Sequence, residues 1–179
     1  MTPHSMSLVD TTLRERLNRR IEGLRNAREI KPGHPSVEIE TLGNYHARAH
    51  ADGFTFDADE PVSKVGGTGT APRPLRYFLA GFAFCLQAQY VRNAIRMGIE
   101  LDDLSIDVDS EIDRRAGLGF RDDPADFESV SYTTRLRTDA PDSDVRALVE
   151  AAESCCYVHG TLSKAVDLDG TTIVNGAPL

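Results

Sequence analysis

The residues of this chain best suited to chemistry are its three cysteines, Cys85, Cys155 and Cys156. A thiolate is a strong nucleophile, and two neighbouring thiols can interconvert with a disulfide. An odd number of widely spaced cysteines is not typical of a secreted disulfide framework. In a reducing compartment we expect buried thiols or redox chemistry instead.

Cys85 lies in the middle of the longest apolar helical pattern of the chain, residues 66–97. The pattern starts as a glycine- and proline-rich loop, and Pro72 and Pro74 are suited to a helix entry. A helix that is apolar over most of its circumference must be buried, so we expect Cys85 near the centre of the fold. The apolar positions at helical spacing are Leu75, Phe78, Leu79, Phe82, Leu86, Val91 and Ile95.

The other two cysteines follow a second helical pattern that starts after Pro141, with Asp142 or Ser143 as the predicted cap. Cys156 comes eleven residues after Val145, about three turns, and therefore falls on the predicted buried stripe. Cys155 falls on the edge of that stripe. Two buried helices would each point a cysteine inward, and the pattern allows a dithiol site.

Alternating strand patterns surround the two helices. Residues 37–41, 45–49 and 54–56 predict an antiparallel meander with one buried face, and a polar loop is expected over 114–127. The order of strands, buried helix, strands, helix and strand predicts an α+β domain. Further strands are predicted at residues 104–110, 130–136 and 170–174.

An arginine-rich helix is predicted over residues 8–30, before the main domain. We therefore divide the chain into a helical extension, 1–33, and a domain, 34–179. The arginines favour a solvated face over an anion-binding role, and the helix could also lie across a partner subunit. Its apolar stripe is Leu13, Leu17, Ile21 and Leu24.

Composition excludes some classes of partner. The chain has 179 residues, 40% of them hydrophobic, and a formal net charge of −8. Nucleic acids and anionic membranes attract basic surfaces, so we expect neither as a partner. We see no run long enough to span a bilayer and no signal peptide, and we expect a cytoplasmic protein.

Four segments together resemble the OsmC/Ohr family: the loop GGTGTAPRP, the helix PLRYFLAGFAFC, the strand LDDLSIDVDSEID and the late ESCCYVHGTL. The resemblance covers about residues 36–176. It implies an OsmC-like fold, antiparallel sheets on a long buried central helix, in an interleaved homodimer. Residue by residue, Cys85 falls on the peroxidatic cysteine of the family and Cys156 on its resolving cysteine. The implied activity is thiol-dependent reduction of organic hydroperoxides or hydrogen peroxide without a cofactor, reset by an external dithiol reductant. Phe78, Phe82 and Phe84 are expected near Cys85, where they would suit an apolar peroxide.

The sequence departs from the family pattern at three places. The first turn of the central helix reads Pro74-Leu75-Arg76, where the family often has a glutamate that helps to orient a catalytic arginine. Arg76 is our candidate electrostatic helper, although it lies nine residues before Cys85. Arg48 and Arg73 are weaker matches to the mobile arginine of the family. Tyr157 replaces the proline after the resolving cysteine, and Cys155 is additional.

Two other interpretations stay open. The missing glutamate favours a non-catalytic dimer of the same fold that binds a small hydrophobic ligand. The N-terminal helix suggests an assembly role. Cys85 and His159 are suitable zinc ligands, but no paired ligand spacing accompanies them, and we expect no metal. The GGTG loop lacks the Lys-Ser/Thr of a phosphate-binding loop.

Overall fold

A computed structural model describes residues 8–29, 31–164, 168, 170–174 and 177–178. The helices and strands alternate as an α+β fold, which confirms the predicted fold class. The helices are α1 (Thr11–Arg25), α2 (Val62–Val65), α3 (Pro74–Met97), α4 (Asp142–Cys155) and α5 (Tyr157–Leu162), with a 3-10 turn, η1 (Ala116–Leu118). The strands are β1 (Glu38–Gly43), β2 (His46–Ala51), β3 (Phe54–Ala58), β4 (Asp103–Glu111), β5 (Ser129–Arg137), β6 (Ile173–Val174) and β7 (Ala177–Pro178).

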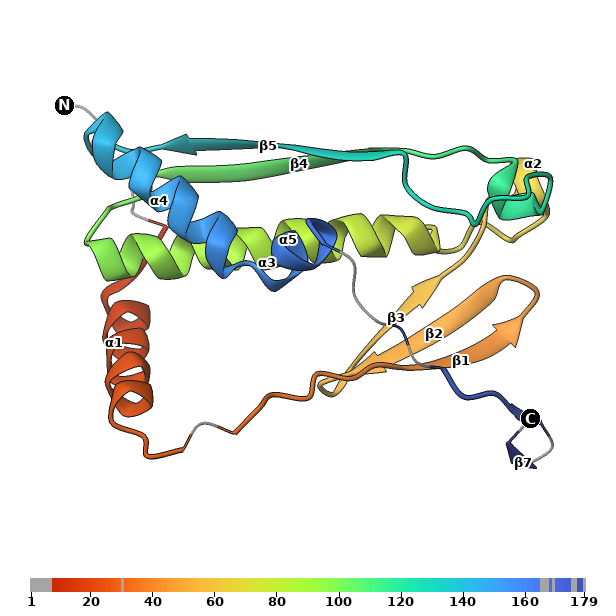
Figure 1. Ribbon diagram of the computed structural model, residues 1–179, viewed down its shortest axis with the longest axis horizontal. Coiled ribbons are helices and arrows are strands. Elements are labelled where there is room, and N and C mark those ends of the chain that lie inside the picture. The colour runs from red at the N-terminus through yellow and green to blue at the C-terminus, as the bar shows by residue number, and fades with distance from the viewer. Residues whose placement is uncertain (1–7, 30, 165–167, 169, 175–176, 179) are drawn as a thin grey trace.

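The central helix α3 organises the molecule (Figure 1). Pro74 stands at its first turn, as predicted, because the missing N–H of proline costs nothing there. Gly98 ends it with φ 71°, a left-handed conformation that glycine adopts without a Cβ penalty. The antiparallel pair β4–β5 runs along one side of α3, and α4 and α5 pack on it as well.

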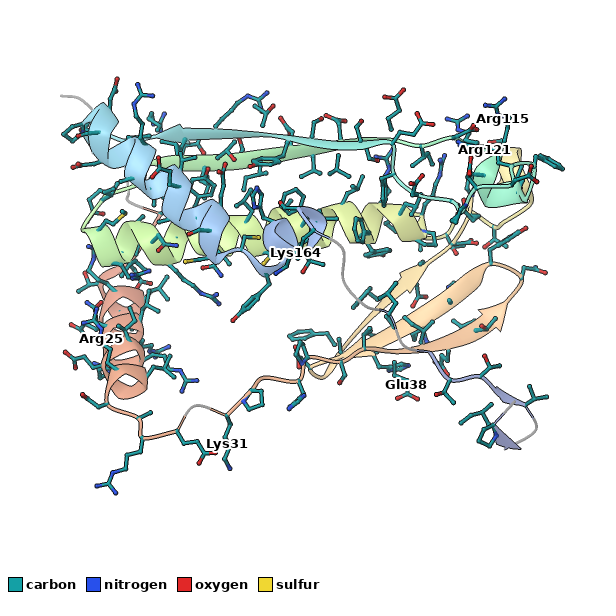
Figure 2. The ribbon with its side chains drawn as sticks, viewed as in Figure 1. Arg25, Lys31, Glu38, Arg115, Arg121 and Lys164 are labelled. Atoms are coloured by element: carbon teal, nitrogen blue, oxygen red, sulfur yellow. The ribbon has the colours of Figure 1, made fainter. Side chains whose placement is uncertain are left out.

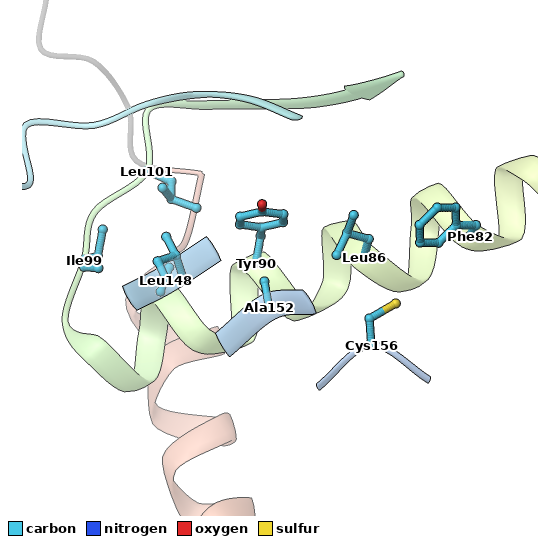
Figure 3. Packing of buried hydrophobic residues seen from close by; sticks show 9 residues of the cluster. Phe82, Leu86, Tyr90, Ile99, Leu101, Leu148, Ala152 and Cys156 are labelled. Carbon is cyan, nitrogen blue, oxygen red and sulfur yellow. The ribbon is translucent and has the colours of Figure 1, made fainter. Parts of the chain in front are cut away.

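The core forms where these elements meet (Figure 3). The apolar positions of β4 and β5 alternate as predicted, and one face of this pair packs on the core. The buried cluster consists of Phe82, Leu86, Tyr90, Ala94, Ile99, Leu101, Leu148, Ala152 and Cys156.

The meander β1–β2–β3 is present, but the prediction of one buried face is wrong for the single chain. All six residues of β1 are exposed, and only Ala49 of β2 is buried. The sheet lies alongside the N-terminal half of α3 (Figure 1), and Phe56 of β3 contacts Tyr77 of α3. No helix or strand of the described chain packs across the face of the sheet. A strand pattern shows which face is apolar and cannot show what packs on it.

Two boundary predictions need correction. Helix α1 covers Thr11–Arg25 instead of 8–30, and residue 30 lies outside the described residues. Asp10 is the N-cap of α1, and its carboxylate accepts a hydrogen bond from the Leu13 N–H at 2.6 Å. Helix α4 has Pro141 at its cap position without a side-chain hydrogen bond, so neither Asp142 nor Ser143 is the cap. The preset backbone angle of proline fixes that helix start without a capping side chain.

Ion pairs cross-link the loop between β4 and β5. Arg115 and Arg121 both pair with Asp113, and these two arginines lie together at this end of the molecule (Figure 2). Hydrogen bonds from Arg115, more than any other cause, lower the pKa of Asp113. The loop predicted over 114–127 is thus an ordered turn that contains η1. Of the strand predicted at 170–174, the pair β6–β7 is described at 173–174 and 177–178.

Candidate functional site

The structure brings two of the three thiols together. Cys85 is half-buried in the middle of α3 and packs against the cluster that contains Cys156, whose side chain is 2% exposed. The thiol of Cys85 is close enough to raise the pKa of the Cys156 thiol, and all three cysteines are in the free, reduced form. The predicted dithiol arrangement is therefore present.

Cys156 reaches this position by a route that its helical spacing did not predict. Helix α4 ends at Cys155, and Cys156 has the extended angles φ −84° and ψ 111°. Its sulfur accepts the backbone N–H of His159 at 3.5 Å and so caps α5. Cys156 is thus buried, as expected, but at the break between two helices instead of on a continuous helical stripe. Its sulfur points toward α3 (Figure 3).

The protonation of Cys156 is set by its surroundings. Burial raises the pKa of the Cys156 thiol, and the neighbouring sulfur of Cys85 raises it further. The backbone N–H groups of His159 and Val158 act in the opposite direction without cancelling the effect. Cys156 is therefore a protonated thiol at neutral pH, able to donate a hydrogen bond to Cys85.

Three rings from α3, β5 and α5 contact one another next to the cluster that contains Cys156. The ring of Tyr132 meets Phe82 edge-on, with 5.3 Å between centroids, and meets His159 edge-on at 6.0 Å. The hydroxyl of Tyr132 donates to Oε1 of Glu153 at 2.7 Å. Burial, with help from this hydrogen bond, raises the pKa of Tyr132, so the hydroxyl stays a donor. The Tyr132–Glu153 pair ties the last turn of α4 to β5, three residues before Cys156. Sequence reasoning missed it because the two residues meet only in the folded chain.

Of the three phenylalanines expected near Cys85, Phe82 belongs to the buried cluster against which Cys85 packs. Phe82 is buried beside Cys156, and Phe78 stacks on Phe127 with centroids 5.2 Å apart. Phe84 is 72% exposed and faces away from the core, so in the single chain it does not help to enclose Cys85.

The arginine candidates lie apart from the thiols. Arg76 is exposed in the first turn of α3, about 13 Å from Cys85 along the helix axis at the usual rise per residue. That turn contains no acidic residue. Arg48 on β2 donates two hydrogen bonds to Asp57, at 2.7 and 2.9 Å, and Arg73 is half-buried at the helix start. Hydrogen bonds from Arg48 and then from His46 lower the pKa of Asp57.

A buried carboxylate that the sequence analysis did not single out shapes the entry to α3. Asp59 has no exposed surface, and its side chain accepts hydrogen bonds from Glu60, Thr68 and Thr70. These bonds, led by the one from Thr68, lower the pKa of Asp59. Asp59 thereby holds the glycine-rich loop in place ahead of the thiol-bearing helix. The sequence holds one clue: Thr68 and Thr70 follow Asp59 in a glycine-rich loop, and Asp side chains commonly accept hydrogen bonds from loop residues.

Among the described residues no group of three histidine, cysteine, aspartate or glutamate side chains is arranged to hold a metal ion. No described helix is both long and apolar enough to cross a bilayer.

Fold and site together define a two-thiol α+β protein built on a central helix. The model of the family described as OsmC-like protein matches residues 67–170, more than half of the chain, and the chain belongs to this family. An uncharacterized protein of Haloferax volcanii is 26% identical over 128 residues, which cover 68% of this chain and 89% of that protein.

Solved structures share the fold. A crystal structure of an OsmC-like protein from Mycoplasma pneumoniae has a TM-score of 0.65 at 16% identity, over 75% of this chain and 91% of that one. An organic hydroperoxide resistance protein from Legionella pneumophila has a TM-score of 0.58 at 22% identity, over 77% of this chain and 95% of that one. The OhrB organic hydroperoxide resistance protein of Bacillus subtilis has a TM-score of 0.53 at 20% identity, over 75% of this chain and 94% of that one. The suspected family and its fold are thereby confirmed.

Proposed function

We propose that this protein is a thiol-dependent peroxidase that reduces organic hydroperoxides, or hydrogen peroxide, with Cys85 as the nucleophile and Cys156 as the resolving thiol. The observation that carries the proposal is the contact between a half-buried thiol on α3 and a buried thiol at the α4–α5 break. Two relatives of the same fold are named organic hydroperoxide resistance proteins, which agrees with this chemistry.

The two thiols have different roles in the proposed reaction. The Cys85 thiolate attacks the terminal oxygen of the peroxide, the O–O bond breaks, and the alkoxide leaves and takes up a proton. Cys85 is then a sulfenic acid. The Cys156 sulfur attacks it and forms a disulfide, and the hydroxyl leaves as water with the Cys156 proton. The raised pKa of Cys156 supports this assignment, because the resolving thiol keeps its proton until the sulfenic acid has formed. An external dithiol reductant then restores both thiols, which requires a reducing compartment such as the cytoplasm.

We further propose that the protein works as a homodimer. Large apolar side chains of the β1–β3 sheet and its approach stay exposed in the single chain, among them Ile39 at 60% and Phe54 at 75%. A surface of this kind is typical of an interface. Arg76, the proposed electrostatic helper, lies nine residues before Cys85 on α3, so any help from it requires a side chain that folds back or a second subunit.

The experiment is a single-turnover reaction. Reduced protein is mixed with one equivalent of cumene hydroperoxide, quenched by alkylation, and mapped for disulfides by mass spectrometry. We expect a Cys85–Cys156 disulfide in the wild type and no peroxide consumption by Cys85→Ser. Cys156→Ser should consume one equivalent and stop at the sulfenic acid, which a dimedone probe detects. Equal peroxide consumption by wild type and Cys85→Ser would refute the proposal.

One observation favours the second candidate, a non-catalytic dimer that binds a small hydrophobic ligand. The first turn of α3 has no carboxylate, and Leu75 stands there 47% exposed. This alternative predicts negligible peroxide consumption together with an apolar molecule that stays bound through purification and is released on denaturation. Native mass spectrometry before and after denaturation distinguishes it from the peroxidase.

A further inference from the structure

The three thiols, one on α3 and two at the junction of α4 and α5, differ in exposure. Cys155, the last residue of α4, is exposed, Cys85 is half-buried, and Cys156 is buried at 2% exposure. The exposed and the buried thiol are consecutive in the chain. An external reductant therefore reaches Cys155 directly, whereas the sulfur of Cys156 is screened by the core.

This difference in exposure makes it difficult for a reductant to convert the Cys85–Cys156 disulfide back to two thiols. Thiol–disulfide exchange requires the attacking sulfur to approach a disulfide sulfur along the S–S axis, so access controls the rate. In a Cys85–Cys156 disulfide the Cys156 sulfur is buried against Phe82 and Leu86, and Cys85 packs on the same cluster. The rigid surface of a folded protein cannot enter such a site, whereas a small or flexibly tethered dithiol can.

We propose that Cys155 is an exchange residue that passes reducing equivalents from an external dithiol protein to the buried Cys156 sulfur. The inference rests on the proposed peroxidase function and adds a third redox-active residue to it. The local backbone suits the role, because α4 stops at Cys155 and α5 starts at Tyr157. The joint between the two cysteines thus lies outside a continuous helix.

The proposed exchange takes three steps. The Cys155 thiolate attacks the Cys156 sulfur, a Cys155–Cys156 disulfide forms, and Cys85 leaves as a thiolate. One thiolate of the external dithiol then attacks the exposed Cys155 sulfur, and Cys156 leaves and takes up a proton. The second thiol of the reductant attacks its partner in the mixed disulfide, which releases Cys155 and leaves the reductant oxidised. Two electrons pass from the dithiol to the original disulfide.

The intermediate disulfide is short-lived for a geometric reason. Consecutive Cα atoms lie about 3.8 Å apart across a trans peptide, closer than the roughly 4.4–6.8 Å of ordinary disulfides. Such a bond is strained, and strained, exposed disulfides are the labile ones. Cys155–Cys156 therefore forms in small amounts and is removed quickly by the reductant.

The test compares two reductants on the full chain. Wild type, Cys155→Ser and the control Ser154→Ala are oxidised to the Cys85–Cys156 disulfide with one equivalent of cumene hydroperoxide. They are then reduced with dithiothreitol or with a thioredoxin-type protein, and free thiols are followed by quenched alkylation and mass spectrometry. We expect Cys155→Ser to form the disulfide at the wild-type rate, to react with dithiothreitol within about twofold of wild type, and to react at least about tenfold more slowly with the protein reductant. Ser154→Ala should stay near wild type with both.

A second variant shows the intermediate directly. Cys85→Ser treated with diamide should give a Cys155–Cys156 disulfide, seen as the loss of two hydrogens from the peptide that contains both residues. Equal reduction of wild type and Cys155→Ser by the protein reductant overturns the exchange role and leaves the peroxidase intact. If peroxide forms no Cys85–Cys156 disulfide in the wild type, the peroxidase proposal fails, while diamide oxidation still allows the same comparison of reductants.

Discussion

The hydrogen bond between Tyr132 and Glu153 should set how fast the two thiols combine, and Tyr132→Phe tests this. The change removes only the hydroxyl that donates to Glu153 at 2.7 Å. The remaining ring keeps its edge-on contacts with Phe82 and His159. The last turn of α4 then loses its tie to β5, and Cys156 is less firmly held beside Cys85.

The magnitude follows from the partners. A hydrogen bond to a charged group contributes about 1.5–3 kcal/mol. Tyr132 and Glu153 are both partly exposed, so water compensates in part, and we expect a loss of about 1–2 kcal/mol in the free energy of unfolding. This corresponds to a factor of roughly 5–30 in the folded-to-unfolded ratio. The rate of Cys85–Cys156 disulfide formation should fall severalfold.

Two measurements check the prediction. Urea unfolding of the reduced protein gives the free energy, and quenched-flow alkylation after one equivalent of hydroperoxide gives the disulfide rate. Tyr157→Phe is the matched control, since it removes the same hydroxyl from a side chain that is 83% exposed beside Cys156. If Tyr132→Phe and Tyr157→Phe behave alike in both assays, the reasoning about this tie is refuted.

Three further predictions concern the core, the loop and the extension. Leu148→Ala should cost about 2–5 kcal/mol in urea unfolding because Leu148 is fully buried, whereas Leu118→Ala, at 64% exposure, should stay within about 0.5 kcal/mol; equal losses would contradict the assigned core. The folded-state pKa of Asp59 lies below its unfolded value near 4, so its carboxylate adds stability above that value, which is lost as the pH falls. Asp59→Asn should therefore flatten the stability curve below about pH 5, and parallel curves for variant and wild type would contradict this. The apolar stripe of α1 has no buried residue in the single chain, so it is available to a second subunit. Ile21→Asp should therefore weaken self-association in sedimentation and leave single-turnover peroxide consumption unchanged. Unchanged association would contradict a role of that stripe in assembly.

Periodicity predicted the parts of the fold that local sequence determines. The long apolar pattern gives α3, and its end at Gly98 was predictable because a left-handed residue commonly ends a helix. The alternating patterns give β4 and β5 with the correct face inward. The exposure of the meander was not predictable, because an apolar strand pattern does not show what packs on its apolar face.

The site was predictable in its thiols and not in their setting. Cys85 and Cys156 come together because α3 and α4 pack on each other, and helical spacing pointed both inward. The hydrogen bond of Tyr132 to Glu153 and those accepted by Asp59 depend on contacts between residues that are separated in sequence. Polar residues in strands and loops carry no periodic signal for such contacts.

The break between α4 and α5 resolves a mechanical problem of the proposed reaction. The sulfurs of Cys85 and Cys156 are free thiols and must approach to about 2 Å to form a disulfide, so one side of the pair has to move. Cys85 cannot move easily, because it lies within a helix whose neighbouring turns carry the buried Phe82 and Leu86. Cys156 can, because its sulfur is held by one long bond from the His159 N–H, and the chain on either side belongs to separate helices. The predicted continuous helix through Cys156 would have made both sides rigid. We infer that disulfide formation shifts Cys156 toward α3, releases the cap of α5, and brings the change to the exposed residues Cys155 and Tyr157, where a reductant meets the protein.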